Sequence, residues 1–323
     1  MPGSFASARS PCNHRLVRQH SPETDAPTTP RVIPPVRINR TVLMSGADHF
    51  SDAQAINAYM DKDVRIDIPR AVEEHGQIRR ALEDAGVTVL AVDPPANCQD
   101  GVYTANWALV RGEVAILSSL PNARRGEEPY AEQVLRDLGN DIIRVPDGVR
   151  FSGQGDALPC GNLLLVGTRY RTDLEAHAFV ADQIGYDVVS LQCIPKRRFG
   201  KWGRPVINDD SGWPDSFFYD IDLAIAVLRD DLIAWCPEAF VPASQARIRA
   251  LPVEKIEVSY EEATKGFACN LVSTGERVIM SARAPRLQAA IEDRGILTTT
   301  IDAAELGKGG GYIRCCTLTL DNK

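Results

Sequence analysis

The stretch that decides the fold is residues 106–146, NWALVRGEVAILSSLPNARRGEEPYAEQVLRDLGNDIIRVP. It begins with two short apolar runs on either side of Arg-Gly-Glu, a pattern that predicts a β-hairpin. An amphipathic segment at residues 128–139 follows and ends at a glycine, as helices commonly do. The apolar run at residues 141–146 then indicates another strand. The stretch therefore predicts one hairpin–helix–strand unit.

The same unit recurs along the chain. Hairpins are predicted at residues 222–237 and 270–281, and helices that end at a glycine at residues 172–185 and 284–295. Thr172 is the expected N-cap of the first of these helices. A repeated supersecondary unit predicts an array or a propeller-like closure rather than two unrelated domains. No GxGxxG or Walker A motif joins a strand to a helix, so nucleotide-binding folds have little support.

The ends of the chain differ in composition. Residues 21–36, SPETDAPTTPRVIPPV, hold five prolines in sixteen residues, which cannot repay the entropy of ordering. We therefore expect a disordered proline-rich tail at residues 1–38 and a single domain at residues 39–323.

The overall composition narrows the class of protein. The 323 residues are 44% hydrophobic with a net charge of −7, and the one basic cluster, residues 195–204, is expected to be a solvated loop rather than a nucleic-acid footprint. No apolar run approaches the roughly 18–20 residues needed to cross a bilayer, and the first twenty residues lack the apolar middle of a secretory signal. Eight dispersed cysteines without CxxC spacing predict free thiols and no structural zinc. We expect a cytoplasmic protein without nucleic-acid, membrane, metal or cofactor partners.

Six blocks of sequence carry a resemblance. They are MSGADHFSDAQAINAYM (44–60), DGVYTANWALV (100–110), FSGQGDAL (151–158), TRYRTDLEAH (168–177), FFYDIDLAI (217–225) and GGGYIRCCT (309–317). In this order they resemble the guanidine-modifying amidinotransferase superfamily, which includes dimethylarginine dimethylaminohydrolase, arginine deiminase and arginine dihydrolase. The resemblance implies an α/β-propeller of five ββαβ modules, the pentein fold, around a central channel that holds the active site.

The resemblance also implies a cysteine nucleophile. In such enzymes a thiolate attacks the guanidinium carbon, ammonia or an amine leaves, and water cleaves the covalent thiouronium. Cys315 matches this nucleophile, and the three glycines before it are expected to let the backbone wrap closely against the substrate. Because the thiolate is the reactive species, nearby positive charge, including the bound guanidinium, must lower its pKa. Cys316 is expected to point the opposite way along a strand.

Five further positions match ligand contacts of the superfamily. Asp222 and Asp100 would grip the guanidinium, and Asn106 stands where arginine deiminases have Asp and the dihydrolase-like branch has Asn. Arg171 would pair with an α-carboxylate, and Asn57 would contact the amino-acid end of the ligand. Asp156 is expected to brace a turn instead. At Asn57 the match is incomplete, because Ala58 and Tyr59 replace a Pro-Trp pair.

Two departures affect the proton-transfer machinery. Ser152 replaces a Glu that acts as an acid/base partner, and Asp220 replaces the His that protonates the leaving group and activates water. An ordinary Asp, with a pKa of about 3.9, cannot donate a proton at neutral pH as imidazolium does. Asp220 and Asp222 are two residues apart on an expected strand and so face the same side, where mutual repulsion could keep Asp220 protonated. His49 could reach the site instead, whereas His177 is expected to be a packing residue.

Two functions remain open at this point. The first is a hydrolase acting on arginine or an N-methylated arginine, with Cys315, Asp220 and Ser152 as the reacting set and a homo-oligomer as one possible assembly. The second is a catalytically impaired member that binds a guanidino ligand or a protein partner. Loss of both proton-transfer groups could lower the rate by ~10⁴-fold or more. A pure scaffold needs no nucleophile, so the glycine-cysteine turn argues against a third possibility, the ribosome anti-association factor that shares this propeller.

Overall fold

The predicted hairpin–helix–strand unit is present. Strands β3 (Ala108–Arg111) and β4 (Val114–Leu117) pair antiparallel, and Gly112, with φ of +58°, makes the turn between them. Helix α2 (Glu128–Asp137) then leads to β5 (Asp141–Arg144), which pairs parallel to β4. A parallel third strand needs such a crossover, because only an antiparallel strand can follow a short turn.

The structure, a computed structural model, describes residues 36–53, 60, 64–197, 203–207 and 214–322. Asn57 and most of the predicted tail lie outside the described residues. At the end of that tail, Arg37 Nη2 donates to Ala85 O at 3.0 Å, and Ile38 N donates to Thr274 O at 3.3 Å.

Within the described residues the unit occurs five times, in five three-stranded sheets of the same topology. The other four sheets have the strand orders β15–β1–β2, β6–β7–β8, β9–β10–β11 and β12–β13–β14. Their strands are β1 (Thr41–Ser45), β2 (Thr88–Val92), β6 (Ala157–Cys160), β7 (Leu163–Gly167), β8 (Asp187–Leu191), β9 (Ile225–Arg229), β10 (Leu232–Trp235), β11 (Glu254–Glu257), β12 (Val272–Ser273), β13 (Arg277–Ser281), β14 (Leu297–Ile301) and β15 (Leu318–Thr319). The expected five-module pentein fold is confirmed.

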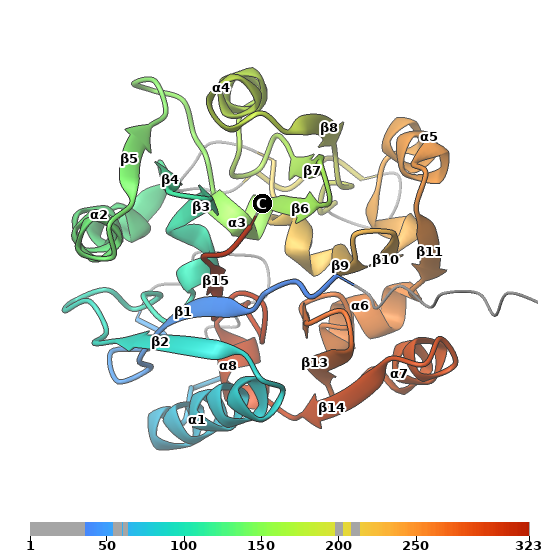
Figure 1. The fold of residues 1–323 in the computed structure, drawn as a ribbon, viewed down its shortest axis with the longest axis horizontal. Helices are drawn as coiled ribbons and strands as arrows, with labels where there is room; N and C mark the ends of the chain where they lie inside the picture. Colours follow the sequence, from blue (N-terminus) through green and yellow to red (C-terminus); the bar gives the residue numbers. More distant parts are fainter. Residues whose placement is uncertain (1–35, 54–59, 61–63, 198–202, 208–213, 323) are drawn as a thin grey trace, which may run out of the picture. The chain divides into compact units, whose positions relative to one another are not determined.

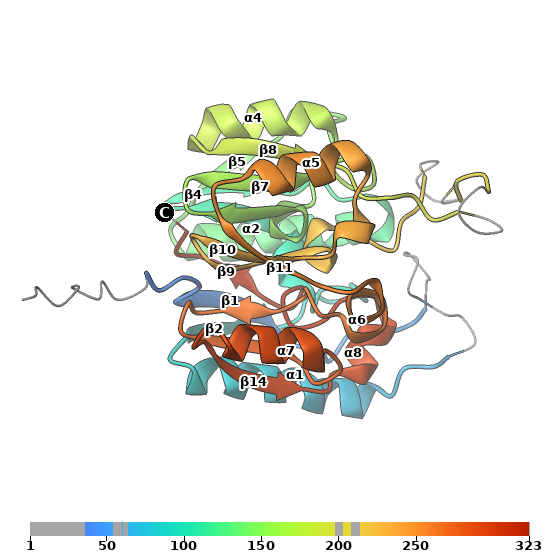
Figure 2. The ribbon, with the colours of Figure 1, turned by 90° about the vertical axis from the view of Figure 1, so that its right-hand side faces the viewer.

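Each module has one crossover helix. Besides α2, these helices are α1 (Ile68–Asp84), α4 (Leu174–Ile184), α5 (Pro242–Ala250) and α7 (Pro285–Glu292). Figure 1 shows all five helices at the periphery of the domain, whereas strands β3, β6, β9 and β15 lie nearer its middle. Figure 2 shows α4 and α1 on opposite sides, with the sheets between them. In the described part of the chain, no helix has the length and apolar character needed to span a membrane.

The ring of modules closes through the two ends of the described chain. Strand β15 pairs antiparallel with β1, with Thr319 opposite Val42. Just beyond β15, Asp321 accepts hydrogen bonds from Thr41 N at 3.0 Å and from Arg40 Nε at 2.9 Å. The first module is therefore assembled from both ends of the chain.

Helix α1 differs in detail from its prediction. Ile78 and Leu82 are buried as expected, but Val72 is 37% exposed, and Ala71 and His75 complete the buried stripe. Residues three and four apart share a helix face, so this stripe starts one residue before Val72 and leaves that side chain beside it.

Several short elements were not predicted, because one or two turns show no periodicity. They are α3 (Gly153–Asp156), α6 (Tyr260–Gly266) and α8 (Ala304–Lys308). Buried Glu74 of α1 caps α8, since its Oε2 accepts from Glu305 N at 2.8 Å and Leu306 N at 3.1 Å. This contact fixes where the chain enters the glycine-rich turn.

A buried glutamine joins the closing strand to the third module. Gln154 Nε2 donates to Thr319 O at 2.7 Å, and its Oε1 accepts from Thr319 N at 2.9 Å. The side-chain amide thus pairs with both backbone groups of one β15 residue, as a neighbouring strand would.

Replacing Gln154 by Leu should destabilise the fold by about 2–4 kcal/mol, because it leaves buried backbone donors and acceptors unpaired. The free energy of unfolding, measured in urea, tests this. Gln183→Leu, on the exposed side of α4, is the matched control and should change it by less than about 0.5 kcal/mol. Equal effects of the two variants would show that the Gln154 bridge does not hold β15.

Candidate active site

The glycine-rich turn brings the chain against two tyrosines. Gly310 has φ of +94°, and its carbonyl accepts from the Tyr219 hydroxyl at 2.7 Å. A Cβ at Gly309 would lie 2.3 Å from the Tyr103 hydroxyl, and one at Gly311 would lie 2.5 Å from the Tyr103 ring. The close contact with Tyr103 is thus one reason for these glycines. That they also let the backbone approach a substrate stays a prediction, and Gly309 and Gly311 line the cavity described below.

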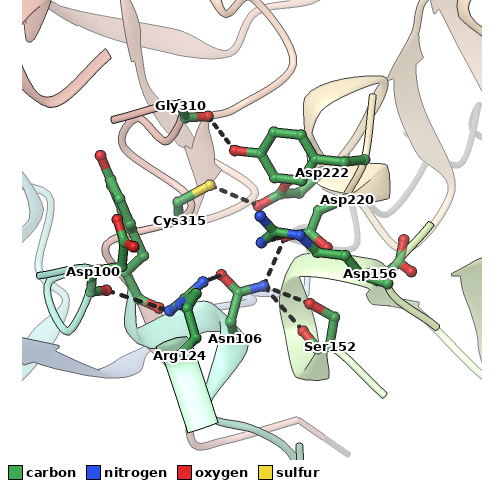
Figure 3. A network of polar contacts seen from close by, with 12 residues as sticks. Asp100, Asn106, Arg124, Ser152, Asp156, Asp220, Asp222, Gly310 and Cys315 are labelled. Atoms are coloured by element: carbon green, nitrogen blue, oxygen red, sulfur yellow. Dashed lines mark hydrogen bonds and ion pairs between the residues drawn. The ribbon is translucent and has the colours of Figure 1, made fainter. Parts of the chain in front are cut away.

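Cys315 follows this turn and is buried among polar groups. Its Sγ lies 3.3 Å from Asp222 Oδ2 (Figure 3). The same sulfur lies 3.2 Å from Asn270 Nδ2. Asn270 Oδ1 also accepts from Cys315 N at 3.2 Å and from Tyr312 N at 3.1 Å, so one amide positions both the backbone and the sulfur. Burial, and then the neighbouring Asp222, raise the pKa of the Cys315 thiol well above its usual value.

The two aspartates of the Asp-Ile-Asp triplet do not lie on a strand. Asp220 precedes a 3₁₀ turn at residues 221–223 that contains Asp222. Both still belong to one site, because Asp222 contacts Cys315 while Asp220 Oδ2 accepts from Asn106 Nδ2 at 2.8 Å. Their proximity comes from the turn, not from strand alternation.

The raised pKa values in this cluster of aspartates belong to Asp222 and Asp156. Burial, and then Asp220, raise the pKa of Asp222 to about 8. Burial and Asp220 also raise the pKa of Asp156 well above its usual value. Asp220 itself is bound by Asn106 and by Arg171 Nη1 at 3.4 Å, which are contacts that a carboxylate makes. The geometry therefore favours Asp222 over Asp220 as the protonated member of the pair.

Asn106 links two other predicted residues, Ser152 and Asp220, to Arg124. Its Nδ2 donates to Ser152 Oγ at 2.9 Å and to Ser152 O at 3.1 Å as well as to Asp220, and its Oδ1 accepts from Arg124 Nη1 at 2.7 Å. Figure 3 shows this amide between Arg124 and Ser152. The Arg124 contact fixes the orientation of the amide, because an oxygen must face the guanidinium.

Arg124 was not identified from the sequence. It is buried, its Nε and Nη2 each lie 2.8 Å from a carboxylate oxygen of Glu127, and its Nη2 donates to Tyr103 O at 3.2 Å and Asp100 O at 3.3 Å. Burial alone would lower its pKa, but the bidentate Glu127 carboxylate outweighs this and raises it. An Arg three residues before a Glu looks like an ordinary surface pair, so the sequence offered no signal for it.

Three carboxylates of the site have an unused oxygen. Within the described residues, Asp100 Oδ1, Asp220 Oδ1 and Asp222 Oδ1 are buried without a hydrogen-bond partner. Burial, opposed by Arg124, raises the pKa of Asp100 to about 6. Unpaired buried acceptors are costly, so such a set favours a site built to receive a donor-rich cation.

Asp100 and several neighbouring residues of the site surround a small cavity. Its lining residues are Asp100, Tyr103, Asn106, Arg124, Arg171, Tyr219, Gly309, Gly311 and Cys315. The Arg171 guanidinium lies 4.1 Å from the centre of the Tyr219 ring, so one planar cation already stacks at its wall. Among the described residues, no group of three or more His, Cys, Asp or Glu side chains is arranged to hold a metal ion.

The remaining predicted residues lie outside this cluster. His177 is a packing residue that contacts Gly167 O at 2.9 Å and Ser190 Oγ at 2.7 Å. His49 is exposed and lines a neighbouring pocket, to whose wall Asp100 and Arg124 also contribute. Asp156 accepts from Ile221 N at 3.0 Å and so braces the turn before Asp222.

Two details of local structure also differ from expectation. Thr172 does not cap α4: Asp173 takes the N-cap position, and the Thr172 hydroxyl accepts from Ser152 N at 3.3 Å. Cys316 follows Cys315 in a turn rather than a strand and packs in the apolar core.

Comparison with known proteins places this architecture in a family. The sequence model of the eukaryotic N,N dimethylarginine dimethylhydrolases matches residues 46–321. The chain belongs to this family. The resemblance to the guanidine-modifying superfamily is thereby confirmed.

Relatives of the family include both dimethylargininases and arginine dihydrolases. The N(G),N(G)-dimethylarginine dimethylaminohydrolase of Mycobacterium tuberculosis is 31% identical over 283 residues, which cover 87% of this chain and 86% of that protein. The bifunctional arginine dihydrolase/ornithine cyclodeaminase ArgZ of Synechocystis is 29% identical, and the match covers 86% of this chain but only 37% of ArgZ.

Solved structures agree with the fold. The N-terminal domain of ArgZ, a cyanobacterial arginine dihydrolase, bound to its substrate, matches with a TM-score of 0.77 and 28% identity, over 87% of this chain and 98% of that one. A dimethylarginine dimethylaminohydrolase carrying an S-methyl-L-thiocitrulline adduct matches with a TM-score of 0.70 and 20% identity, a likeness that concerns the fold alone.

Alanine at Gly309 should destabilise the protein by about 1–3 kcal/mol, because its methyl group must displace Tyr103 and Phe50 from buried positions. Thermal unfolding measures the effect. Gly307→Ala is the control, since a Cβ there meets no atom closer than 3.4 Å and lies in helix α8, where alanine is tolerated. Similar melting temperatures for both variants would contradict the packing explanation of the glycine run.

Asp222→Asn should stabilise the fold increasingly as the pH rises. The native pKa of Asp222 is about 8 and its unfolded value about 3.9, so the native state holds the proton more tightly. The contribution of Asp222 to stability is therefore complete below pH ~4 and is lost as the pH rises toward 8. In urea unfolding from pH 5 to 9, the free energy of unfolding of the variant should rise relative to that of the parent by up to about 1.4 kcal/mol per pH unit.

The control for this series is Asp182→Asn, on an exposed position of α4. Its unfolding free energy should follow that of the parent at every pH. If the Asp222→Asn curve also runs parallel to the parent, the carboxyl is not protonated in the native site.

Proposed function

We propose that this chain hydrolyses a C–N bond in the guanidino group of arginine or an N-methylated arginine through the thiolate of Cys315 and a covalent thiouronium. The observation that carries the proposal is the cavity in which Cys315 Sγ lies 3.3 Å from Asp222, beside carboxylates with unused oxygens. The relatives named as dimethylargininases and arginine dihydrolases support the same substrate class.

A guanidinium fits the unused acceptors by charge and shape. It is flat, permanently charged and rich in N–H donors, which pair bidentately with carboxylates. Asp100 lines the cavity, and Asp222 and Asp220 lie behind its wall, in contact with the lining residues Cys315 and Asn106 respectively. Binding of the cation favours the ionised form of Asp222 and lowers the pKa of the Cys315 thiol, so the nucleophile is activated only when substrate is present.

The proposed first half-reaction uses Asp222 as proton carrier. Its carboxylate takes the thiol proton while the sulfur forms a bond to the guanidinium carbon. The same proton then passes to the departing nitrogen as its bond to carbon breaks, which leaves the thiouronium and ammonia or an amine. The 3.3 Å contact between Sγ and Asp222 Oδ2 is the geometry that this transfer requires.

The second half-reaction assigns Asp220 the role that a histidine has in relatives. Its carboxylate accepts one proton from the water that attacks the thiouronium carbon, and returns it to the sulfur when the C–S bond breaks. The second proton of that water leaves the new hydroxyl group for solvent or for the released ammonia or amine, as the neutral ureido product forms. Ser152 and Asn106 hold this end of the site, with Asn106 Nδ2 donating to both Ser152 and Asp220. Asn106 also favours arginine over dimethylarginine as substrate, since the dihydrolase-like branch has Asn at this position.

A second candidate function is a binder without turnover. It is favoured by the contacts of Asp220, which is already occupied by Arg171 at 3.4 Å and by Asn106. These contacts occupy one oxygen of Asp220, and Ser152 has no acid/base capacity near neutral pH. Such a protein would bind guanidino compounds and leave them intact.

Incubation of the protein with arginine and with dimethylarginines should yield ammonia or a methylamine together with a ureido product. Rapid acid quenching should also trap a thiouronium mass on the peptide 315–323. Cys315→Ser should remove both signals, whereas Cys316→Ser, the neighbouring buried cysteine, should keep them. Asp220→Asn should lower the rate by roughly 10²–10⁴-fold if Asp220 activates water.

The outcomes separate the two candidates. Calorimetric binding of arginine without product or adduct would establish the binder and exclude the hydrolase. Turnover that survives Cys315→Ser would exclude the thiolate mechanism. Cytoplasmic localisation and a homo-oligomeric assembly stay predictions of the sequence.

A further inference from the structure

Arg314, the residue before Cys315, is buried without a carboxylate partner. Its Nη1 donates to Thr317 O at 3.2 Å, Thr317 Oγ1 at 3.3 Å and Thr319 Oγ1 at 3.2 Å, and its Nη2 donates to Gln154 Oε1 at 2.9 Å. Every one of these acceptors is neutral. Among the described residues, no carboxylate forms an ion pair with it.

The other two arginines of the site are already neutralised. Arg124 forms a bidentate pair with Glu127, and Arg171 pairs with Asp220. Neutral dipoles satisfy the hydrogen bonds of a buried guanidinium, but they do not cancel its charge, which acts over a longer distance in a water-poor interior. Arg314 therefore differs from its neighbours in having a charge left to act on the site.

The groups that bear on the Cys315 sulfur are otherwise acidic or neutral. Asp222 contacts it, and Asp220, Cys316 and Tyr103 also interact with it electrostatically. Burial and Asp220 raise the pKa of Asp222, whereas Arg314 opposes this rise. The site lacks the imidazolium that relatives place at the position of Asp220, so a positive charge is needed from another element.

We propose that Arg314 is a positioning residue whose fixed charge lets the Cys315–Asp222 pair give up a proton when a guanidinium compound binds. The proposal rests on the proposed function only in taking Cys315 as the nucleophile. One proton leaves the pair to solvent as one cation enters, so the charge of the site is conserved on binding. The positive charge of Arg314 stabilises the Cys315–Asp222 pair after it has lost a proton, in an interior that otherwise disfavours a negative charge.

A purely structural role must be distinguished from this one. Arg314 also ties the 312–317 turn to Thr319 and Gln154, and any substitution of a buried arginine removes packing as well as charge. The deciding measurement is the pH dependence of thiol reactivity, because lost packing changes stability without moving the midpoint of that profile.

The experiment follows alkylation of Cys315 by iodoacetamide as a function of pH, without substrate, with the modified residue located by mass spectrometry. In Arg314→Met the midpoint should rise by at least about one pH unit, so that alkylation at any pH below both midpoints is roughly tenfold slower. Arg314→Lys should restore most of the shift. Thr317→Val, which removes a hydrogen bond of Arg314 but keeps its charge, should leave the midpoint in place. An unchanged midpoint in Arg314→Met would overturn the proposal.

A second variant covers the case in which Arg314→Met does not fold. Asp222→Asn keeps Arg314 and removes the acid that opposes it. Burial still raises the pKa of the thiol in this variant, but the Asp222 carboxyl no longer does, so the Cys315 midpoint should fall below that of the parent. An unchanged midpoint would overturn the proposal. Neither profile requires turnover, so a protein that shows the shifts but has no hydrolase activity would refute the proposed function while keeping this role for Arg314.

Discussion

The pairing of β15 with β1 is the constraint on which the rest of the structure depends. Four modules take all three of their strands from consecutive sequence, but the first has to borrow one from the far end of the chain. After β14 the chain must therefore return through α8 and the glycine-rich turn before it can reach β1. Cys315 lies on this return segment, three residues before β15, which places it among residues from the other modules.

The chemistry of the site follows from the charges that this return segment meets. Folding brings Cys315 beside Asp222, and burial together with the neighbouring acids raises the pKa of both groups, which opposes their ionisation. Such an arrangement destabilises the free protein and is relieved by a cation, which is a common relation between a binding site and fold stability. Asp220 adds a further carboxyl group to this acidic cluster, and the buried arginines gain importance as a result.

The fold was largely predictable from sequence because its information is local and repeated. Residues 106–146 contain a complete module, and the hairpins at 222–237 and 270–281 repeat its first half. Strand β15 could not be predicted, because two residues are too few to show an alternating hydrophobic pattern. Its partner strand β1 also lies near the opposite end of the sequence. The prediction of Thr172 as the N-cap of α4 was wrong for a related reason, because its hydroxyl makes a tertiary contact with Ser152 instead.

The site residues that belong to a sequence motif were predictable. Those whose role depends on packing against distant parts of the chain were not. Cys315, Asp222, Asn106, Ser152, Asp220, Asp100 and Arg171 were found through matched blocks, and the structure brings them together. Arg124, Asn270 and Arg314 acquire their roles only through partners distant in sequence. The suggestion that Asp220 holds a proton stays a prediction, and the contacts of Asn106 and Arg171 with its carboxyl group could not be foreseen from a strand pattern.

The closure of the ring by a late strand has a consequence for how the protein matures. Translation delivers the strands of modules two to five before residues 315–319, so these modules can begin to fold while the first still lacks its outer strand. The sulfur and the strand that closes the ring then emerge within five residues of one another. A nascent chain on the ribosome thus has no assembled reaction centre, and competence arises together with completion of the architecture.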